Sequence, residues 1–292
     1  MTQGPCRSLL FAPGNHSRKA EKVFTVGADV AILDLEDAVA VAEKPGARAA
    51  VVEALKQPRT CKGYVRVNAR DTEFCEADLK AVVGPWLDGI MLPKVESAAE
   101  LLSVDKLIQG LEREHGMEPG GIDLLPIVET AKGVDGVSEI AGSGSRVRRL
   151  SFGAIDLARD LNLRLSEDEW ELTPARWSIA LASRVARLDQ PLDSVWAQYK
   201  DTDGLRKSSE RARDLGFQGK MAIHPDQVAA INDVFTPSGD EAAKAEKIIA
   251  AFEEAEAAGS ASIQVDGLFV DYPVVEQARR TLELIKRIRG DG

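Results

Sequence analysis

Two short apolar segments of the sequence each end in a carboxylate. Glu129 lies in LLPIVETAKG and Asp156 in LSFGAIDLARDL. Both segments resemble buried strands that pass into a helix at the acid, where a carboxylate costs free energy unless something binds it. A hard cation such as Mg²⁺ accepts one or two carboxylates and fills its other positions with water or substrate oxygens. We therefore predict that these acids hold Mg²⁺, with Mn²⁺ as a substitute; the alternative is that each acid caps the following helix.

A second set of charged residues lies nearer the N-terminus. Arg66 stands between valines in YVRVN and must face acids or an anionic ligand, because an unpaired charge in apolar surroundings is costly. Its planar guanidinium suits a carboxylate or a developing enolate oxygen. Glu36 and Asp37 in ILDLEDAV would hold metal-bound water or orient Arg66, or they simply begin a helix. A structural salt bridge from Arg66 to Glu36 is compatible with ligand binding.

Three further residues have chemistry that the sequence leaves open. Lys94 in MLPKVES either forms a Schiff base with a carbonyl substrate or neutralises the acids, and we favour the second interpretation. His224 in AIHPDQ either contacts ligand or makes a structural hydrogen bond. Asp271 in VDGLFVDYP is either a turn acid or a general acid/base with a raised pKa.

Apolar, strand-like runs alternate with amphipathic, helix-like stretches over the first 225 residues. This alternation predicts an α/β fold, a (β/α)8 TIM barrel, and not a doubly wound sheet, because no GxGxxG follows the first strand. Barrel active sites lie at the C-terminal ends of the strands, so the polar residues there form the candidate site. The expected strands span residues 8–13, 30–37, 64–68, 89–95, 122–129, 148–156, 192–199 and 220–225, of which 192–199 has the weakest pattern.

About a fifth of the chain follows the eighth strand. We expect a catalytic barrel over residues 1–235 and a C-terminal helical extension over residues 236–292, with a turn at Asp266-Gly267 between two helices. The extension either covers one end of its own barrel or reaches a neighbouring subunit, and the residues alone leave both arrangements open.

Composition excludes several classes of protein. The net charge of −10 argues against nucleic acid as a partner, and the absence of an 18-residue apolar run argues against a membrane span. The apolar stretch near the N-terminus is too short for a signal peptide. Three cysteines without metal-binding spacing indicate reduced thiols. We therefore expect a cytoplasmic enzyme.

The segments together resemble the HpcH/HpaI aldolase and citrate lyase β-subunit superfamily, specifically its CitE-like branch. The resemblance covers nearly the whole chain, because nine motifs occur in the family's order between Arg7 and Arg280. These motifs are RSLLFAPGN, ILDLEDAV, EKPGAR, VRVN, GIMLPKVES, PIVETAKGV, FGAIDLARDL, GFQGKMAIHPDQV and DGLFVDYPVVEQARR.

The resemblance implies a Mg²⁺-dependent carbon–carbon lyase that cleaves a 3-hydroxyacyl-CoA to acetyl-CoA and a 2-oxo acid in a reversible, Claisen-type reaction. The substrate would be of the malyl-CoA or citramalyl-CoA type. By the same resemblance the metal ligands are Glu129 and Asp156, and Arg66 contacts substrate. Metal-proximal acids are implied at Glu36 and Asp37, and contacts with CoA at Arg7, Lys44, Arg48 and His224.

In the malyl-CoA and citramalyl-CoA lyases of this family, an aspartate after a DGxxxD turn is the catalytic acid/base and comes from a neighbouring subunit. Asp271 matches that aspartate, so the resemblance implies a homotrimer or a dimer of trimers. Ile155, Asn162-Leu163 and Ala69 depart from frequent family residues and leave the acyl group open. The alternatives are a citryl lyase β subunit of a citrate lyase complex, a malyl-CoA thioesterase, a CoA-independent aldolase and a metal-free scaffold subunit.

Overall fold

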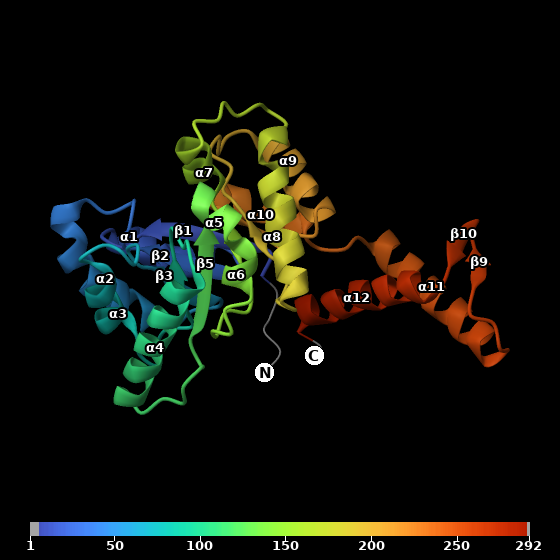
Figure 1. Cartoon of the computed structure of the whole chain (residues 1–292), viewed down its shortest axis with the longest axis horizontal. Helices are drawn as coiled ribbons and strands as arrows, with labels where there is room; N and C mark the ends of the chain where they lie inside the picture. Colours follow the sequence, from blue (N-terminus) through green and yellow to red (C-terminus); the bar gives the residue numbers. More distant parts are fainter. Residues whose placement is uncertain (1–5, 291–292) are drawn as a thin grey trace. The chain divides into compact units, whose positions relative to one another are not determined.

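Eight parallel strands close into a barrel in the order of the sequence, in a computed structural model that describes residues 6–290 (Figure 1). This confirms the predicted barrel. The seventh strand is present but contains only two residues, because Ser194 leaves the ladder and accepts a hydrogen bond from the backbone N–H of Ala154 at 2.8 Å. The strands are β1 (Ser8–Pro13), β2 (Val30–Asp34), β3 (Lys62–Arg66), β4 (Gly89–Leu92), β5 (Asp123–Val128), β6 (Ser151–Phe152), β7 (Leu192–Asp193) and β8 (Gly219–Ala222).

Helices follow the strands, and side-chain caps mark where several of them begin. Ser97, Thr130 and Asp201 each accept a backbone N–H of the first turn that they precede. The helices are α1 (Ser17–Lys22), α2 (Lys44–Leu55), α3 (Cys75–Val82), α4 (Ala98–Glu114), α5 (Ala131–Asp135), α6 (Val137–Ala141), α7 (Ala154–Asp160), α8 (Thr173–Val185), α9 (Thr202–Asp214) and α10 (Pro225–Val234), with short 3-10 turns η1 (Val23–Thr25), η2 (Val41–Glu43) and η3 (Trp170–Leu172).

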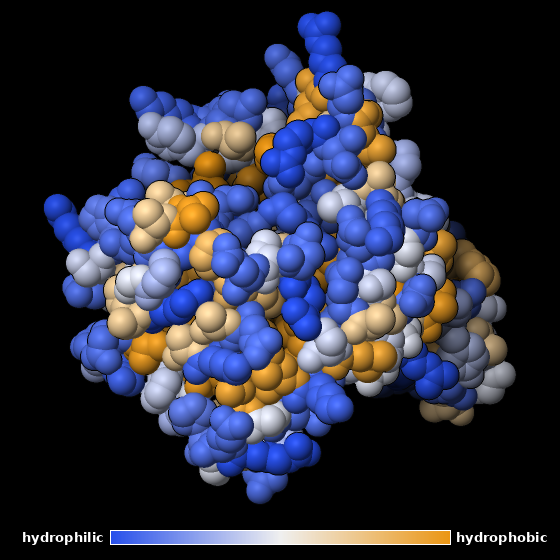
Figure 2. Space-filling model, turned by 60° about the vertical axis from the view of Figure 1, so that its left-hand side comes forward, coloured by the Kyte–Doolittle hydropathy of each residue, from blue (hydrophilic) through white to orange (hydrophobic). Residues whose placement is uncertain are grey.

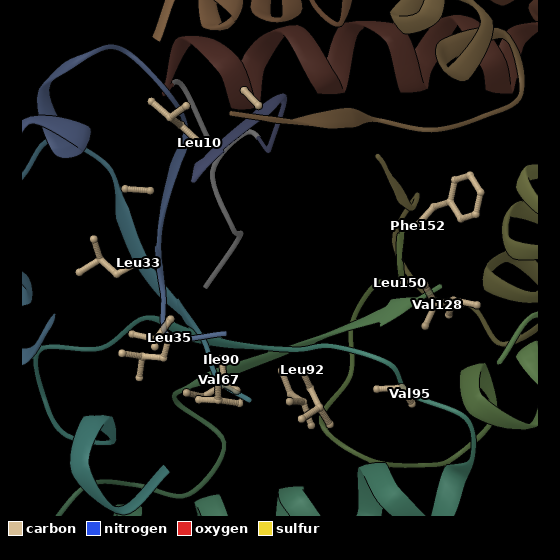
Figure 3. Close-up of a cluster of buried hydrophobic side chains, with 14 of the residues drawn as sticks. Leu10, Leu33, Leu35, Val67, Ile90, Leu92, Val95, Val128, Leu150 and Phe152 are labelled. Carbon is tan, nitrogen blue, oxygen red and sulfur yellow. The ribbon is translucent and has the colours of Figure 1, made fainter. Parts of the chain in front are cut away.

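Strand alternation separates two layers of the core. One layer lies between strands and helices and includes Leu10, Leu33 and Ile90 (Figure 3). The other layer fills the barrel and includes Leu9, Val30, Ile32, Tyr64, Met91, Leu125, Ile127, Leu192 and Met221. Because alternate residues of a strand share a face, the positions that follow Ile32, Tyr64 and Ile127 by two also point inward. These positions are Asp34, Arg66 and Glu129.

Paired charges lie at the N-terminal ends of the strands. Just before β1, Arg7 donates to Asp29 through its backbone N–H, Nε and Nη2 at 2.7, 2.9 and 2.8 Å. The Tyr64 hydroxyl donates to Asp123 at 2.6 Å, and burial, reinforced by Asp123, raises the pKa of that phenol. Two further ion pairs, Arg59–Asp88 at 2.7 Å and Arg149–Asp189 at 3.0 Å, lie at the same end.

A buried ionic network lies outside the strands β7 and β8. Asp193 and Lys220 alternate with the inward-facing Leu192 and Met221, so they face the helices. Arg176 of α8 donates to Asp193 through Nε at 2.8 Å, and Lys220 donates from Nζ at 2.5 Å. Burial alone would raise the pKa of Asp193, but Arg176 and Lys220 outweigh it and lower the pKa to about 2.

The residues from 236 onward belong to a second compact unit. It contains α11 (Gly239–Ala257), an antiparallel hairpin of β9 (Ile263–Val265) and β10 (Leu268–Val270), and α12 (Tyr272–Arg289). Asp266 and Gly267 both have positive φ, as a two-residue hairpin turn requires, so the predicted turn is confirmed. The unit has its own core, which includes Ile248, Phe252, Val265, Val270 and Val275.

The surface is largely polar. On the face that Figure 2 shows, hydrophilic side chains predominate and apolar ones lie in patches between them. Among residues 6–290, none of the helices has both the length and the apolar character that a membrane span requires.

Candidate active site

Arg66 and Asp34 form a two-point ion pair at the C-terminal ends of β3 and β2. The parallel register places the two residues directly opposite each other. Nε and Nη2 of Arg66 donate to the two carboxylate oxygens of Asp34 at 2.8 and 2.6 Å. The guanidinium also lies 4.9 Å from the ring of Phe11. Burial would lower the pKa of Arg66, but Asp34 outweighs burial and raises it, so the guanidinium is held charged in one orientation.

Asp34 was not among the site residues that the sequence predicts. Its signal was available, because Ile32 is an inward-facing strand residue and Asp34 follows it by two positions. Asp34 also accepts the backbone N–H groups of Glu36 and Ala38 at 2.9 and 3.0 Å, so it shapes the loop after β2. The predicted salt bridge from Arg66 to Glu36 is present as a secondary contact, with Nη1 3.1 Å from Oε2. Asp37 lies farther away, at 3.6 Å from the same nitrogen.

Lys94 connects two groups of acids. Its backbone N–H donates to Oε1 of Glu129 at 2.9 Å, and its amino group contacts Oε1 of Glu36. Burial would lower the pKa of this amine, but Glu36 outweighs burial and raises it. A protonated amine is not a nucleophile, so the geometry favours the charge-partner interpretation over the Schiff base.

Glu129 is a buried acid, 3% exposed, at the end of β5. Burial, followed by the negative charges of Asp156 and Glu36, raises its pKa to about 8. Gly153 makes room for this side chain, because an added Cβ at Gly153 would lie 2.5 Å from the Cβ of Glu129 and nearer still to Oε2. Gly153 belongs to the FGAIDL motif, and its function is visible only in its packing against Glu129.

Asp156 lies in the first turn of α7 and is partly exposed. Its carboxylate pairs with Arg159 at 2.8 Å, one turn along the same helix. The negative charge of Asp156 raises the pKa of Glu129, because the two carboxylates repel each other.

The strand ends carry an excess of negative charge that fits a divalent cation. Two buried or half-buried cations, Arg66 and Lys94, face a larger set of carboxylates, and Oε2 of Glu36 has only the ion-pair contact with Arg66 and accepts no hydrogen bond. In the described part of the chain, no three His, Cys, Asp or Glu side chains are grouped to hold a metal by themselves. A pair of carboxylates that leaves positions for water and substrate oxygens suits Mg²⁺. The acids concerned are Asp34, Glu36, Asp37, Glu129 and Asp156.

The expected CoA contact of Arg7 needs correction. Arg7 precedes β1, so it lies at the N-terminal end of the barrel, opposite the acids, and it is paired with Asp29. The motif was correctly placed on the first strand, but the arginine stands before that strand and not after it.

Lys44 also has an internal function in the structure. Its amino group is buried and donates to the backbone oxygens of Leu35 and Glu36 and to Oδ1 of Asn68, at 2.9, 2.7 and 2.6 Å. These bonds use all three N–H groups of the ammonium, which leaves none for a phosphate. Lys44 and Asn68 therefore hold the loop that carries the acids after β2.

Arg48 and His224 each make a structural hydrogen bond and are partly exposed. Arg48 uses Nε for Asp78 at 2.7 Å. His224 follows β8, caps α10 by accepting the N–H of Asp226 at 3.2 Å, and stacks on Tyr199 with ring centroids 4.9 Å apart. The side chain of His224 is 39% exposed, so its structural hydrogen bond does not exclude a ligand.

Asp271 begins α12 in the C-terminal unit. Its Oδ1 accepts the N–H of Val274 at 3.4 Å, a weak cap. The neighbouring Phe269 and Tyr272 are 64% and 54% exposed, which is unusual for large aromatic side chains. The contact of Asp271 with Val274 is that of a turn acid, and its catalytic function stays a prediction.

Comparisons with known proteins show the family to which the chain belongs. The family described as HpcH/HpaI aldolase/citrate lyase matches residues 7–225. Citrate lyase subunit beta of Leuconostoc mesenteroides subsp. cremoris is 37% identical over 280 residues, which cover 95% of this chain and 92% of that protein. An L-malyl-CoA/beta-methylmalyl-CoA lyase of Cereibacter sphaeroides is 36% identical, with 94% and 92% covered. A (3S)-malyl-CoA thioesterase of the same species is 39% identical, with 95% and 94% covered.

A solved structure shares the fold over nearly the full length. CitE from Mycobacterium tuberculosis, in complex with magnesium, acetoacetate and coenzyme A, matches with a TM-score of 0.80 and 30% identity. The match covers 97% of this chain and 99% of that one.

Proposed function

This chain is a lyase of the HpcH/HpaI aldolase/citrate lyase family, and from that membership we propose that it cleaves a 3-hydroxyacyl-CoA in a Mg²⁺-dependent reaction. The substrate is of the malyl-CoA or citramalyl-CoA type, and the products are acetyl-CoA and a 2-oxo acid. The observation that carries this proposal is the buried Glu129, with a pKa raised to about 8 beside Asp156, in a site that also holds Arg66. The names of the lyase relatives and of the magnesium and coenzyme A complex support it.

Glu129 and Asp156 would hold the cation at the strand ends. When bound, Mg²⁺ polarises substrate oxygens and lowers the pKa of the substrate hydroxyl. Gly153 leaves the space that the Glu129 carboxylate occupies. The N–H of Lys94 holds one oxygen of Glu129, and the other oxygen lies beside Gly153.

Arg66 stabilises the charge that develops during cleavage. The substrate hydroxyl gives its proton to a carboxylate of the strand-end site, the carbon–carbon bond breaks, and its electron pair becomes the enolate of acetyl-CoA as the 2-oxo acid leaves; one proton is later returned to the enolate carbon. Arg66 is held by Asp34, with Nη1 on the side of Glu36, and offers positive charge to the enolate oxygen. Glu36 and Asp37 orient this arginine and hold metal-bound water.

Asp271 supplies the proton that the enolate carbon accepts, and removes it in the reverse direction. We propose that it comes from a second copy of the chain, in a homotrimer or a dimer of trimers. Mixing inactive Asp271→Ala and Arg66→Ala proteins under subunit exchange should then restore part of the activity. No recovery despite verified exchange would mean that each chain builds its own site.

The reaction is tested by one set of incubations. The purified chain is mixed with malyl-CoA, citramalyl-CoA, methylmalyl-CoA and citryl-CoA, with Mg²⁺ or with EDTA, and the products are read by mass spectrometry. We expect acetyl-CoA or propionyl-CoA together with a 2-oxo acid, and only with Mg²⁺. Equal turnover in EDTA would contradict the metal-dependent reaction.

Two other outcomes correspond to named relatives. Free CoA with an intact hydroxy acid would indicate the thioesterase reaction, the activity for which the 39% identical relative is named. No turnover of any free thioester would indicate the β subunit of a citrate lyase complex, with a substrate held on a carrier protein, because a citrate lyase subunit is 37% identical.

A further inference from the structure

Lys94 contacts both halves of the acidic site through different atoms. The backbone N–H bonds Glu129, the acid at the end of β5, while the amino group contacts Glu36 and lies 4.0 Å from Asp37, both after β2. Glu36 in turn faces Arg66 through its other oxygen, 3.1 Å away. Lys94 therefore connects Glu129, the acid beside Asp156, with the ion pair of Glu36 and Arg66.

The backbone of Lys94 has a conformation that lysine seldom adopts. Its φ is 53°, in the left-handed region, which costs a side chain with a Cβ about 1 kcal/mol or more. Asp266, which has a similar φ, lies in a hairpin turn where that conformation is normal. Lys94 instead follows the barrel strand β4, and non-glycine residues with this strain cluster at functional sites.

The next residue shows what the conformation achieves. Val95 is buried, and its N–H donates to the backbone oxygen of Ile127 on β5 at 3.2 Å. The chain thus remains hydrogen-bonded to β5 on both sides of the strained residue, and the intervening N–H of Lys94 is directed at the Glu129 carboxylate. A regular strand at this position would give alternate N–H groups to the ladder and would not aim one at a side chain.

We propose that Lys94 is a positioning residue with two separable functions. Its backbone, in the left-handed conformation, fixes one oxygen of Glu129, so that the other oxygen is presented to a divalent cation. Its amino group holds Glu36 and thereby the orientation of Arg66. The inference rests on the proposed function and extends it, because it assigns to Lys94 the alignment of Glu129, the proposed metal ligand, with Arg66, the proposed substrate contact.

Three substitutions separate the two functions. Lys94→Gly removes the amine but keeps the N–H and favours positive φ. Lys94→Ala removes the same amine and, like lysine, pays for positive φ, but it lacks the contact with Glu36 that helps to hold this conformation in the wild type. Lys94→Asn also lacks the amine, and asparagine tolerates the left-handed region. The readout is the Kd of the full-length protein for Mn²⁺, measured by electron paramagnetic resonance without substrate, with thermal unfolding as a check on folding.

We expect Lys94→Gly and Lys94→Asn to bind Mn²⁺ within about threefold of the wild type, and Lys94→Ala to bind about fivefold more weakly than Lys94→Gly, as about 1 kcal/mol of backbone cost implies. Both Lys94→Gly and Lys94→Asn should lose about 10- to 100-fold in kcat/KM. Equal Mn²⁺ affinities of the glycine and alanine variants, or a wild type that binds no Mn²⁺, would overturn the inference. A wild type that binds Mn²⁺ but cleaves no thioester would overturn the proposed function alone.

Discussion

The two ends of the barrel use charge in opposite ways. At the N-terminal ends of the strands, each acid described above has a donor: Asp29 has Arg7, Asp123 has Tyr64, and Asp88 has Arg59. At the C-terminal ends, Glu129 has one backbone N–H, and burial, followed by the charges of Asp156 and Glu36, raises its pKa to about 8. The first arrangement stabilises the fold. The second costs stability, and we propose that it holds a cation.

Two buried acids show the same contrast within one molecule. Asp193 and Glu129 are both almost fully buried, and burial acts in the same direction on both. Arg176 and Lys220 overcome burial at Asp193, whereas Asp156 and Glu36 add to burial at Glu129. Burial of a carboxylate therefore does not indicate its function; the charge of its neighbours does.

The largest effect is expected from Glu129→Gln, which removes one charge and keeps the shape. Activity should fall by more than about 10³-fold, beyond the roughly 10- to 100-fold cost of losing an outer partner of a metal ligand. Steady-state kinetics of Mg²⁺-dependent cleavage provide the measurement. Near-normal turnover would exclude Glu129 from the metal site.

The same variant should be more stable than the metal-free wild type at high pH. The pKa of Glu129 is raised from 4.5 to about 8 in the fold, so its charged form is disfavoured there. The wild type consequently loses stability as the pH rises from 4.5 through 8, whereas glutamine does not titrate. Urea unfolding in EDTA at pH 9 should favour the variant by up to a few kcal/mol, and a less stable variant at that pH would contradict the electrostatic account.

Alanine substitutions at Arg66 and Arg7 should have different effects, because these arginines lie at opposite ends of the barrel. Arg66→Ala should reduce kcat by about 10²- to 10³-fold, the usual cost of losing a group that stabilises a developing oxyanion. Arg7→Ala should leave kcat/KM within about twofold and lower stability by about 1–3 kcal/mol, because Asp29 loses its two side-chain donors and keeps only the backbone N–H of residue 7. Kinetics and thermal unfolding of both variants test this. A large kinetic defect in Arg7→Ala would restore the expected CoA contact.

Gly153→Ala should weaken metal binding by about 10- to 100-fold, because its methyl group meets the Glu129 side chain. Gly110→Ala in α4 is the matched control, since an added Cβ there meets nothing within 4 Å. The control should bind Mn²⁺ normally and gain up to about 1 kcal/mol in stability. Equal Mn²⁺ affinities of the two variants would show that Glu129 does not need the space beside Gly153.

The last prediction involves no substitution and concerns the titration of the two buried carboxyl groups, Glu129 and Asp193. Carboxyl carbon shifts in an isotope-labelled, metal-free sample should titrate near pH 8 for Glu129 and near pH 2 for Asp193. The pKa of Asp193 lies below its usual 3.8, so its ion pairs stabilise the fold above that pH by about 2 kcal/mol, and this is lost as the pH falls through 2. Midpoints near 4 for both groups would remove the contrast between them.

Strand alternation made the barrel and part of the site predictable from the sequence. Apolar runs with acids at their ends located β5 and the start of α7, and hence Glu129 and Asp156. The same alternation could have located Asp34, two positions after Ile32, but the prediction extended this strand to residue 37 and considered only the acids at that end, whereas β2 ends at Asp34. The predicted Arg66–Glu36 ion pair is present, but the two-point pair of Arg66 with Asp34 was not predicted.

Contacts between distant segments were not predictable in the same way. The buried amine of Lys44 has three acceptors on two loops, and no local pattern distinguishes it from a surface lysine at the start of a helix. The left-handed backbone of Lys94 depends on its contacts with β5, because MLPKVES alone does not require it. The end of the barrel at which Arg7 lies was readable from the sequence, since it precedes the apolar run.

The pairing of β6 with β7 has a consequence for how the ring of strands opens. One register pair, Ser151 with Leu192, joins these strands, whereas five pairs join β1 to β2. The side chains of Arg176 and Lys220 add to this short ladder by binding Asp193. Amide hydrogen exchange, which reports local opening, should therefore begin at β6 and β7, while the amides of β1 and β2 should exchange only when the whole barrel unfolds.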